Sequence, residues 1–451
     1  MNPGLLASLI LFPLLGGLLL LCLGKERMAW LKPLALFWTL GELGLALVLW
    51  IGFESRAGFQ FETRLAWLPS LGVSFHLGVD GFSLLLVLLT AFLFPLVILG
   101  SWNSVSDRVK EYLLALLLLE ASLLGTFLAL DLVLFYLCWE TMLLPMFLLI
   151  GVWGGPRRVY ASLKFFLYTA AGSLLMLAAL LYLYFKCGKH SFDLADLLGT
   201  ALTTGEGRWL FAAFFLAFAV KVPLFPFHTW LPDAHVEAPT GGSVLLAGVL
   251  LKMGVYGFLR FAIPLFPEAA SWFTPALVAL AVTGILYGAL ISWVQRDLKK
   301  LVAYSSVSHL GYCLLGLFAG TAPAVAGSAF TMVSHGLATG LLFFLVGMLY
   351  ERRHTRMMED FEGLATPLPR FAASFVVAAL ASAGLPGLSG FVGEFLVLAG
   401  TLGVSFPAAA LAALGMVLSA LYLLRMVSAV CFGPVRLEEN RTLPDLSGRE
   451  A

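Results

Sequence analysis

The chain has 451 residues, of which 61% are hydrophobic and only 12% are charged. Since an ordinary soluble domain has about 25% charged residues, this composition excludes a water-soluble globular protein and an intrinsically disordered one. The 27 basic and 26 acidic residues give a net charge of +1, so no basic face or acidic tail indicates nucleic acid as a partner. At about 20 apolar residues per membrane span, the length allows about a dozen helices in one polytopic domain.

The cysteines and histidines do not follow the spacings of metal or disulfide sites. The five cysteines lack a CxxC pair, so disulfide frameworks, zinc knuckles and cysteine-ligated iron–sulfur clusters are not expected. His228 and His235 stand on opposite sides of a proline-containing loop, which does not favour a metal site. His309 and His335 offer only one imidazole per helix, which does not favour a haem.

Apolar windows of about 19 residues predict an all-α polytopic membrane protein with about thirteen transmembrane helices. The apolar runs are continuous, which excludes the alternating strands of a membrane β-barrel. No basic residue precedes the first run, so we expect a retained helix and not a cleaved signal. The predicted spans are residues 4–23, 31–50, 80–100, 111–130, 132–152, 164–185, 209–229, 241–262, 272–293, 300–319, 323–349, 371–402 and 407–431.

Basic residues divide unequally between the loops that alternate along these spans. Eighteen Lys and Arg residues fall in loops that share one side, and six fall in the opposite set. Cytoplasmic loops of membrane proteins carry an excess of Lys and Arg. The sequence therefore predicts a multi-pass protein with its N-terminus outside and its C-terminus in the cytoplasm.

Several titratable residues fall inside the predicted spans. A charge at a helix centre costs about 2.5–3.5 kcal/mol on insertion scales, so it is rare and faces protein or water. At a rise of about 1.5 Å per residue, Glu140, Lys252, His309 and His335 lie roughly 12–18 Å from an end of their spans. They are therefore expected to form a layer near the middle of a roughly 30 Å hydrocarbon core.

The seventh and twelfth predicted spans are interrupted. Pro223 and Pro226 follow Lys221, so a half-helix should end near Lys221, where free carbonyl groups favour an ammonium. In the twelfth span the sequence AGLPGLSGFVGEF breaks the helix, and Glu394 follows in the early turns of the second half. Because non-helical backbone at membrane depth needs protein or a water-filled cavity around it, both breaks indicate hydrated sites.

The two breaks lie at matching positions of a predicted internal repeat. An offset of five helices inverts the membrane topology of the second copy, as in inverted-repeat transporters. The predicted organisation is N-terminal helices 1 to 3 over residues 1–110, a first five-helix repeat over 111–262, a second over 263–432, and a cytoplasmic tail over 433–451.

A structural role competes with function for each isolated polar residue in a span. Glu42 has no obvious partner in the sequence, and for both Glu42 and Glu120 an interhelical hydrogen bond and a function stay open as alternatives. Asp80 and Asp131 are expected at the membrane interface as helix caps or water-facing groups. Lys221 lies in midspan beside a helix break, so a function is favoured for it.

Four motifs are specific enough to indicate a family. They are LCWETMLLPMFLLIG (137–151), VKVPLFPFHTWLPDAHVEAPTGGSVLLAGVLLKMGVYG (220–257), RDLKKLVAYSSVSHLGY (296–312) and GLPGLSGFVGEF (384–395). These segments closely resemble the antiporter-like membrane subunits of respiratory complex I, NADH-quinone oxidoreductase, and the resemblance extends from about residue 80 to 430. The broken twelfth span carries an acid instead of a lysine. In this feature the chain resembles the type of antiporter-like subunit that has the L and N subunits on either side.

The resemblance implies roles, partners and cofactors. It implies Glu140 with Lys221 as a regulatory ion pair, Lys252 and His335 as central relays, His309 as a relay member and Glu394 as the terminal acid. No cofactor is expected in this chain, and NADH, FMN, iron–sulfur clusters and quinone are expected in other subunits. The implied partners are the other membrane-arm subunits, the lipid bilayer of the bacterial inner membrane, and protons. The family has fourteen helices, so the last one is expected to be absent from this sequence.

The sequence thus predicts a proton-translocating subunit without a redox centre of its own. The hypothesis is a relay from Lys221 to Lys252, His335 and Glu394, with energy arriving from neighbouring subunits through Glu140. Two alternatives stay open at this point. One is a subunit of a Mrp-type cation/proton antiporter or of a membrane-bound hydrogenase, and the other is a membrane scaffold whose polar residues only bond neighbouring helices.

Overall fold

The computed structural model describes residues 4–451, apart from the side chains of residues 25–27. Residues 1–3, the start of the predicted N-terminal segment, lie outside the described residues. In the described part, eleven helices are long and apolar enough to cross a membrane, and two shorter apolar helices accompany them. The predicted all-helical membrane fold is confirmed.

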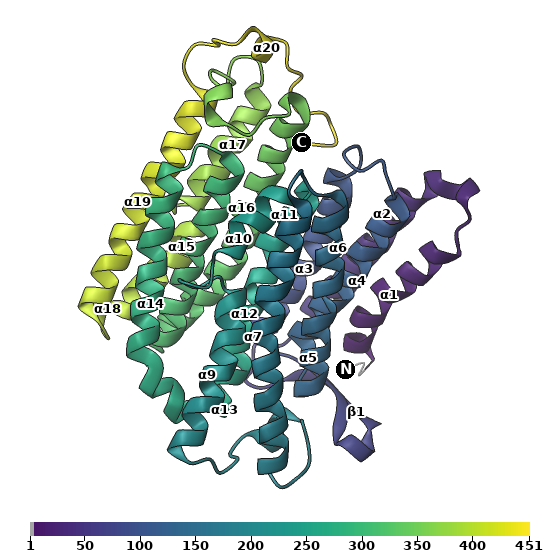
Figure 1. The fold of residues 1–451 in the computed structure, drawn as a ribbon, viewed down its shortest axis with the longest axis vertical. Helices are drawn as coiled ribbons and strands as arrows, with labels where there is room; N and C mark the ends of the chain where they lie inside the picture. The colour runs from purple at the N-terminus through teal and green to yellow at the C-terminus, as the bar shows by residue number, and fades with distance from the viewer. Residues whose placement is uncertain (1–3) are drawn as a thin grey trace. The chain divides into compact units, whose positions relative to one another are not determined.

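By its internal contacts the chain divides into two compact units. Figure 1 labels the helices in chain order and colours them by residue number. Unit 1 comprises residues 1–221 and 249–273, and unit 2 comprises residues 222–248 and 274–451. The predicted five-helix repeats stay a prediction, because this division rests on contacts and not on an internal symmetry.

Unit 1 contains the first nine helices and two short ones from further along the chain. They are α1 (Leu5–Cys22), α2 (Leu31–Gly52), α3 (Gly81–Gly100), α4 (Val109–Leu128), α5 (Leu132–Thr141), α6 (Leu143–Trp153), α7 (Arg158–Lys186), α8 (Leu194–Leu197), α9 (Thr204–Lys221), α12 (Leu251–Gly257) and α13 (Ile263–Leu265). The predicted fifth span is two consecutive helices, α5 and α6, that meet at Met142. Helix α9 ends at Lys221, as the two prolines predict.

Unit 2 contains the remaining helices. They are α10 (Trp230–Glu237), α11 (Thr240–Leu245), most of α14 (Pro267–Val294), α15 (Leu298–Ala319), α16 (Ala322–Arg353), α17 (Pro369–Ser382), α18 (Ser389–Leu402), α19 (Phe406–Cys431) and α20 (Glu438–Arg441). The predicted twelfth span is broken between α17 and α18, where Gly384 and Gly387 have φ angles of +74° and +96°. Only glycine adopts such angles without strain, so these two residues allow the chain to leave one half-helix and enter the next.

A β-hairpin in unit 1 has no counterpart among the predicted elements. Strands β1 (Gln60–Leu68) and β2 (Val73–Val79) pair antiparallel around a turn that ends at Gly72. Gly72 has a φ of +67°, and a Cβ atom there would collide with the carbonyl of His190. The segment between the second and third spans is therefore an ordered element held against the loop that follows α7.

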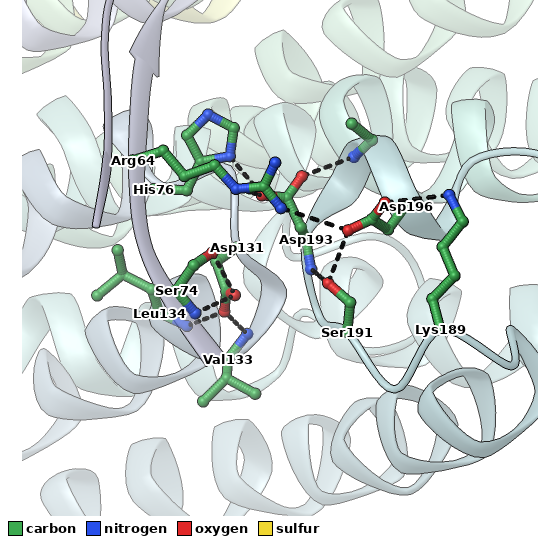
Figure 2. A network of polar contacts seen from close by, with 11 residues as sticks. Arg64, Ser74, His76, Asp131, Val133, Leu134, Lys189, Ser191, Asp193 and Asp196 are labelled. Atoms are coloured by element: carbon green, nitrogen blue, oxygen red, sulfur yellow. Dashed lines mark hydrogen bonds and ion pairs between the residues drawn. The ribbon is translucent and has the colours of Figure 1, made fainter. Parts of the chain in front are cut away.

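A network of polar contacts holds the hairpin to that loop (Figure 2). His76 Nδ1 lies 2.6 Å from Asp193 Oδ2, and Arg64 Nε lies 3.2 Å from the same oxygen. Asp131, the N-cap of α5, accepts hydrogen bonds from the amides of Val133 and Leu134 and, through its other oxygen, from Ser74. Asp131 therefore caps a helix, as predicted, and also binds the hairpin.

Asp80 and Arg260 add a second connection of this kind in unit 1. Asp80 caps α3 by accepting from the amide of Ser83, as predicted for a helix cap, and its Oδ2 lies 2.6 Å from Arg260 Nη2. Burial alone would raise the pKa of the Asp80 carboxyl, but the Arg260 guanidinium and the Ser83 hydrogen bonds hold it below its usual value. Asp80 therefore stays ionised and paired at neutral pH.

The contacts within each unit agree with the predicted alternation of loops. In unit 1, Lys110 Nζ donates to Leu21 O and Leu23 O, which joins the loops after α1 and before α4. In unit 2, the amide of Leu298 donates to Arg356 O, which joins the loops on either side of α15 and α16. Loops predicted to share a side therefore meet within each unit.

The Asp193→Asn substitution is predicted to loosen the hairpin. Burial would raise the pKa of the Asp193 carboxyl, but the hydrogen bond to His76 and the nearby charges of His76 and Arg64 lower it below its usual value. A group with a lowered folded-state pKa stabilises the fold above its unfolded pKa of about 3.9, and this contribution is lost as pH falls through the folded-state value. At neutral pH the loss of the carboxylate should cost about 1–3 kcal/mol.

Hydrogen exchange of residues 60–79 in detergent-solubilised protein measures this loss. Protection should fall about fivefold or more in the Asp193→Asn variant, since about 1.4 kcal/mol is a factor of ten. Lys189→Ala is the control, because its pair with Asp196 is 62% exposed on the lysine side. Equal protection in both variants would contradict the assignment of the buried carboxylate as the main tie.

Candidate functional site

Unit 2 brings three of the predicted site residues together. His309 on α15 and Glu394 on α18 are 3% and 2% exposed, and His309 Nδ1 lies 2.7 Å from Glu394 Oε1. The ring of His335 on α16 lies beside that of His309, with an interplanar angle of 50° and ring centroids 5.6 Å apart. The sequence predicted His309 and His335 at one depth, and the structure places them with Glu394 in one buried cluster.

Hydroxyl groups complete the surroundings of the two imidazoles. Ser306 Oγ lies 3.1 Å from His335 Nε2. Tyr422 OH and Ser382 Oγ lie 3.4 and 3.5 Å from His309 Nε2, so both ring nitrogens of His309 face polar groups. An imidazole between a carboxylate and hydroxyls can accept a proton at one nitrogen and give one up at the other.

A small cavity with room for about one water molecule adjoins this cluster. It is lined by His309, Thr331, Ser334, His335, Ala338, Ala381, Ser382, Gly390 and Glu394. Glu394 Oε2 and Thr331 Oγ1 are buried there and have no hydrogen-bond partner in the protein. Since buried polar groups are almost always satisfied, these two atoms are the ones that a water molecule in this cavity would bond.

The break between α17 and α18 positions Glu394 at the cavity. Glu394 lies in the second turn of α18, close to the positive end of the helix dipole, which favours a negative charge. A Cβ atom on Gly384, at the break, would come within 3.4 Å of Glu394 Oε2, so the open backbone lies directly beside the carboxylate. The predicted link between the helix break and the acid is confirmed by this geometry.

Close packing of α16 against α18 fixes the distance between the cluster residues. A Cβ atom on Gly327 would come within 2.7 Å of both the carbonyl of Gly393 and the amide of Val397. Thr331 meets Gly393 one turn further along α16. Small residues let two helix backbones approach closely in a membrane, so these glycines determine how near Thr331 and His335 lie to Glu394.

Unit 1 holds a second cluster around Lys221, which is 1% exposed at the last residue of α9. Its ammonium lies 5.4 Å from the Trp139 ring centroid and 5.3 Å from that of Phe165, and it donates to Met142 Sδ at 3.6 Å. Aromatic faces stabilise a desolvated ammonium. Lys221 is thus held by weak partners in addition to the carbonyl end of its own helix.

Glu140 on α5 interacts electrostatically with Lys221 but, in the described structure, makes no direct ion pair with it within 4.0 Å. Its Oε1 is buried without a hydrogen-bond partner, and Ser173 lies within hydrogen-bonding reach of the carboxylate. The charge attraction between the two residues therefore acts across a gap. Small movements of α5 or α9 would change it.

Lys252 is fully buried on α12, a helix that packs against both α9 and α4 within unit 1. A π-helical turn precedes α12 at Leu246–Leu250, and another follows at Phe258–Ala262. Such wide turns inside a helix concentrate at functional sites because they reorient side chains. The structure thus places Lys252 on the helix that neighbours the Lys221 helix.

Several residues of these clusters were not identified from the sequence. Ser306 and Tyr422 surround the histidines, and Trp139, Met142 and Phe165 surround Lys221. The motifs LCWETMLLPM and VAYSSVSHLGY contain most of them, so adjacency to Glu140 and His309 was the available signal. Within the described residues, no group of three His, Cys, Asp or Glu side chains is placed to hold a metal ion.

Two family models together match nearly the whole chain. The model described as NADH:quinone oxidoreductase/Mrp antiporter, TM matches residues 129–421, and the model described as NADH-ubiquinone oxidoreductase chain 4, amino terminus matches residues 9–126. The first match covers both clusters, from Glu140 through Glu394.

Individual relatives are similar over almost their full length. NADH-quinone oxidoreductase subunit M of Rhodobacter capsulatus is 49% identical, over 93% of this chain and 84% of that one. NADH-ubiquinone oxidoreductase chain 4 of Arabidopsis thaliana is 45% identical, over 99% of this chain and 90% of that one. A chain in the structure of respiratory complex I from Thermus thermophilus with bound NADH superposes with a TM-score of 0.90 at 38% identity and covers 99% of this chain and 92% of that chain.

The Gly327→Val substitution is predicted to disrupt unit 2. The added Cβ atom and its two methyl groups would meet the backbone of α18, and overpacking against backbone costs about 1–3 kcal/mol or more. The thermal unfolding midpoint in detergent should fall by several degrees, and the His309 to Glu394 geometry should be lost with it. Gly403→Val is the control, since a Cβ atom there has no neighbour within 4 Å. An unchanged midpoint for Gly327→Val would show that α16 and α18 are not held at this distance.

Proposed function

The chain belongs to the NADH:quinone oxidoreductase/Mrp antiporter family and is an antiporter-like, proton-translocating subunit of the complex I type, and we propose that its two buried clusters carry the protons. The observation that carries the proposal is the His309–Glu394 pair beside a polar cavity with two unsatisfied oxygens. Such a group can exchange protons with water in the cavity while the membrane around it stays closed.

In unit 2, the proposed step is proton movement along the hydrogen-bonded groups. A proton on His309 can pass from Nδ1 to Glu394 Oε1 over the 2.7 Å contact, while Nε2 accepts another from the Tyr422 or Ser382 side. His335, held by Ser306, faces the same cavity and can supply that proton through water. Glu394 is then the acid from which the proton leaves the cluster.

In unit 1, we propose that Lys221 binds and releases a proton according to the position of Glu140. When the carboxylate is near, the ammonium is favoured, and when it withdraws, burial against Trp139 and Phe165 favours the neutral amine. Moving one charge against the membrane potential costs about 2.3 kcal/mol per 100 mV. Changes in a buried ion pair are of this scale.

The order of proton transfer between the clusters and the neighbouring subunits are proposed from the sequence. We propose the relay order Lys221, Lys252, His335, Glu394, with energy arriving at Glu140 from a neighbouring membrane-arm subunit and with L and N subunits on either side. The loop charges support a bacterial inner-membrane location with the N-terminus outside and the C-terminus of this chain in the cytoplasm. NADH, FMN, iron–sulfur clusters and quinone are proposed to reside in other subunits.

The Lys221→Ala variant is predicted to abolish most proton pumping. In the assembled complex reconstituted into vesicles, NADH-driven acidification should fall at least tenfold, because the group that binds the proton in unit 1 is lost. Glu394→Gln should have a comparable effect in unit 2, since an amide accepts no proton. Lys186→Ala is the matched control, because that lysine pairs with Glu206 at the surface.

Three results would count against this function. Pumping at the wild-type rate in the Lys221→Ala complex would remove the lysine from the proton path. Loss of assembly with normal pumping in the remaining complex would favour the scaffold alternative. A gradient-driven cation/proton exchange that persists without NADH would favour the Mrp-type alternative.

A further inference from the structure

Two glutamates of unit 1 lie deep in the helices outside the clusters described above. Glu42 is on α2 and Glu120 is on α4, and each is 0% exposed. Each is ten residues from a lysine near the start of its helix, about 15 Å along the helix axis. Both carboxyl groups therefore lie near the middle of a membrane span.

None of the four carboxyl oxygens has a hydrogen-bond partner in the protein. An isolated ionised carboxylate is strongly disfavoured in a low-dielectric interior. An interhelical hydrogen bond, the structural alternative left open by the sequence, would need a donor on a neighbouring helix, and the described residues supply none to either group. A bound proton or cation is what remains to neutralise them.

Glu42 points to the interior of the helix group and not to lipid. Its face of α2 carries the buried residues Ala35, Thr39, Ala46 and Leu49 at helical spacing, and this helix packs against α1, α3 and α4. The opposite face of α2 exposes large apolar side chains such as Phe37 and Ile51. Glu42 also lies near enough to Glu120, on the neighbouring helix α4, for their charges to interact.

The lysines of α2 and α4 themselves bind backbone carbonyls at the ends of helices. Lys32 Nζ donates to Trp102 O and Val105 O, and Lys110 Nζ donates to Leu21 O and Leu23 O, both at the ends of helices. Helices α1, α3 and α6, which pack against α2 or α4, contribute no charged side chain. The titratable groups on the other described elements packed against this pair, and on α2 and α4 themselves, are Lys32, Lys110, Glu111, Tyr112, Cys22, His76, Tyr136, Cys138, Glu140, Lys252 and Tyr256.

We propose that Glu42 and Glu120 form a proton-binding carboxyl pair between α2 and α4. The pair holds at least one proton at neutral pH, because two like charges in one buried site cannot both persist without a counterion. This site goes beyond the proposed relay, since neither residue belongs to it, and it does not depend on that relay being correct. Its ligand is a proton and not a redox group or a metal.

Reaction with dicyclohexylcarbodiimide tests the site in the assembled complex in native membranes. This apolar reagent enters the membrane and modifies protonated carboxyl groups, and peptide mass spectrometry locates the label. From about pH 6 to about pH 9, well above the ordinary Glu value of about 4.3, Glu42 or Glu120 should be labelled. Glu62, exposed on the hairpin, is the matched carboxyl that should stay unlabelled.

The coupling of the two groups is tested by single substitutions. With Glu42→Gln, labelling of Glu120 at the alkaline end should fall several-fold, because the neighbouring negative charge that favours its protonated form is gone, and Glu120→Gln should act likewise on Glu42. If either variant fails to assemble, the wild-type pH profile still decides whether a protonated carboxyl is present.

Three outcomes would overturn the proposal. One is the absence of label at both positions across the whole pH range. Another is labelling of Glu120 that is unchanged by Glu42→Gln, which would mean two independent acids. The third is suppression of the label at fixed pH by sodium or potassium ions, which would assign the pair to a monovalent cation.

Discussion

The free-energy cost of placing a charge in hydrocarbon determines where the charged residues of this protein lie. With 12% charged residues, the chain places nearly all of its Lys and Arg in loops, and each exception has to be satisfied inside the protein. His309 and Glu394 satisfy each other directly, and Lys221 relies on aromatic faces, a sulfur atom and a helix end. The positions of helix breaks and close helix contacts follow from these requirements.

The two clusters that we propose as proton carriers are built in different ways, and the difference bears on the proposed transport. In unit 2 the donor and acceptor are in hydrogen-bond contact, so a proton can move with little change in the backbone. In unit 1 Glu140 acts on Lys221 across a gap, so the affinity of the lysine for a proton depends on the distance between α5 and α9. A conformational signal would therefore act more strongly on the unit 1 cluster, which agrees with the proposed entry of energy at Glu140.

The sequence predicted the spans, the end of α9 at Lys221 and the break before Glu394 because apolar length, proline and glycine act locally. It did not predict the hairpin of residues 60–79, whose strands are only seven to nine residues long and are held by Asp131 and Asp193 from distant parts of the chain. Tyr422 was missed for the same reason, since it reaches His309 across more than a hundred residues. Local signals define elements, and contacts distant in sequence complete the sites.

Glu42 and Glu120 show how a structure can change the interpretation of an isolated acid. From the sequence, an interhelical hydrogen bond was one of two open explanations, because polar residues in membrane helices often find such a partner. The structure removes that explanation, since all four oxygens are buried without a donor. A carboxyl group that has neither a donor nor a counterion can persist in this environment only in its protonated form, and a second acid beside it makes the loss of that proton harder still. The protonation of the pair therefore depends on the cost of placing a charge in hydrocarbon, which also determines where the other charges of the chain can lie.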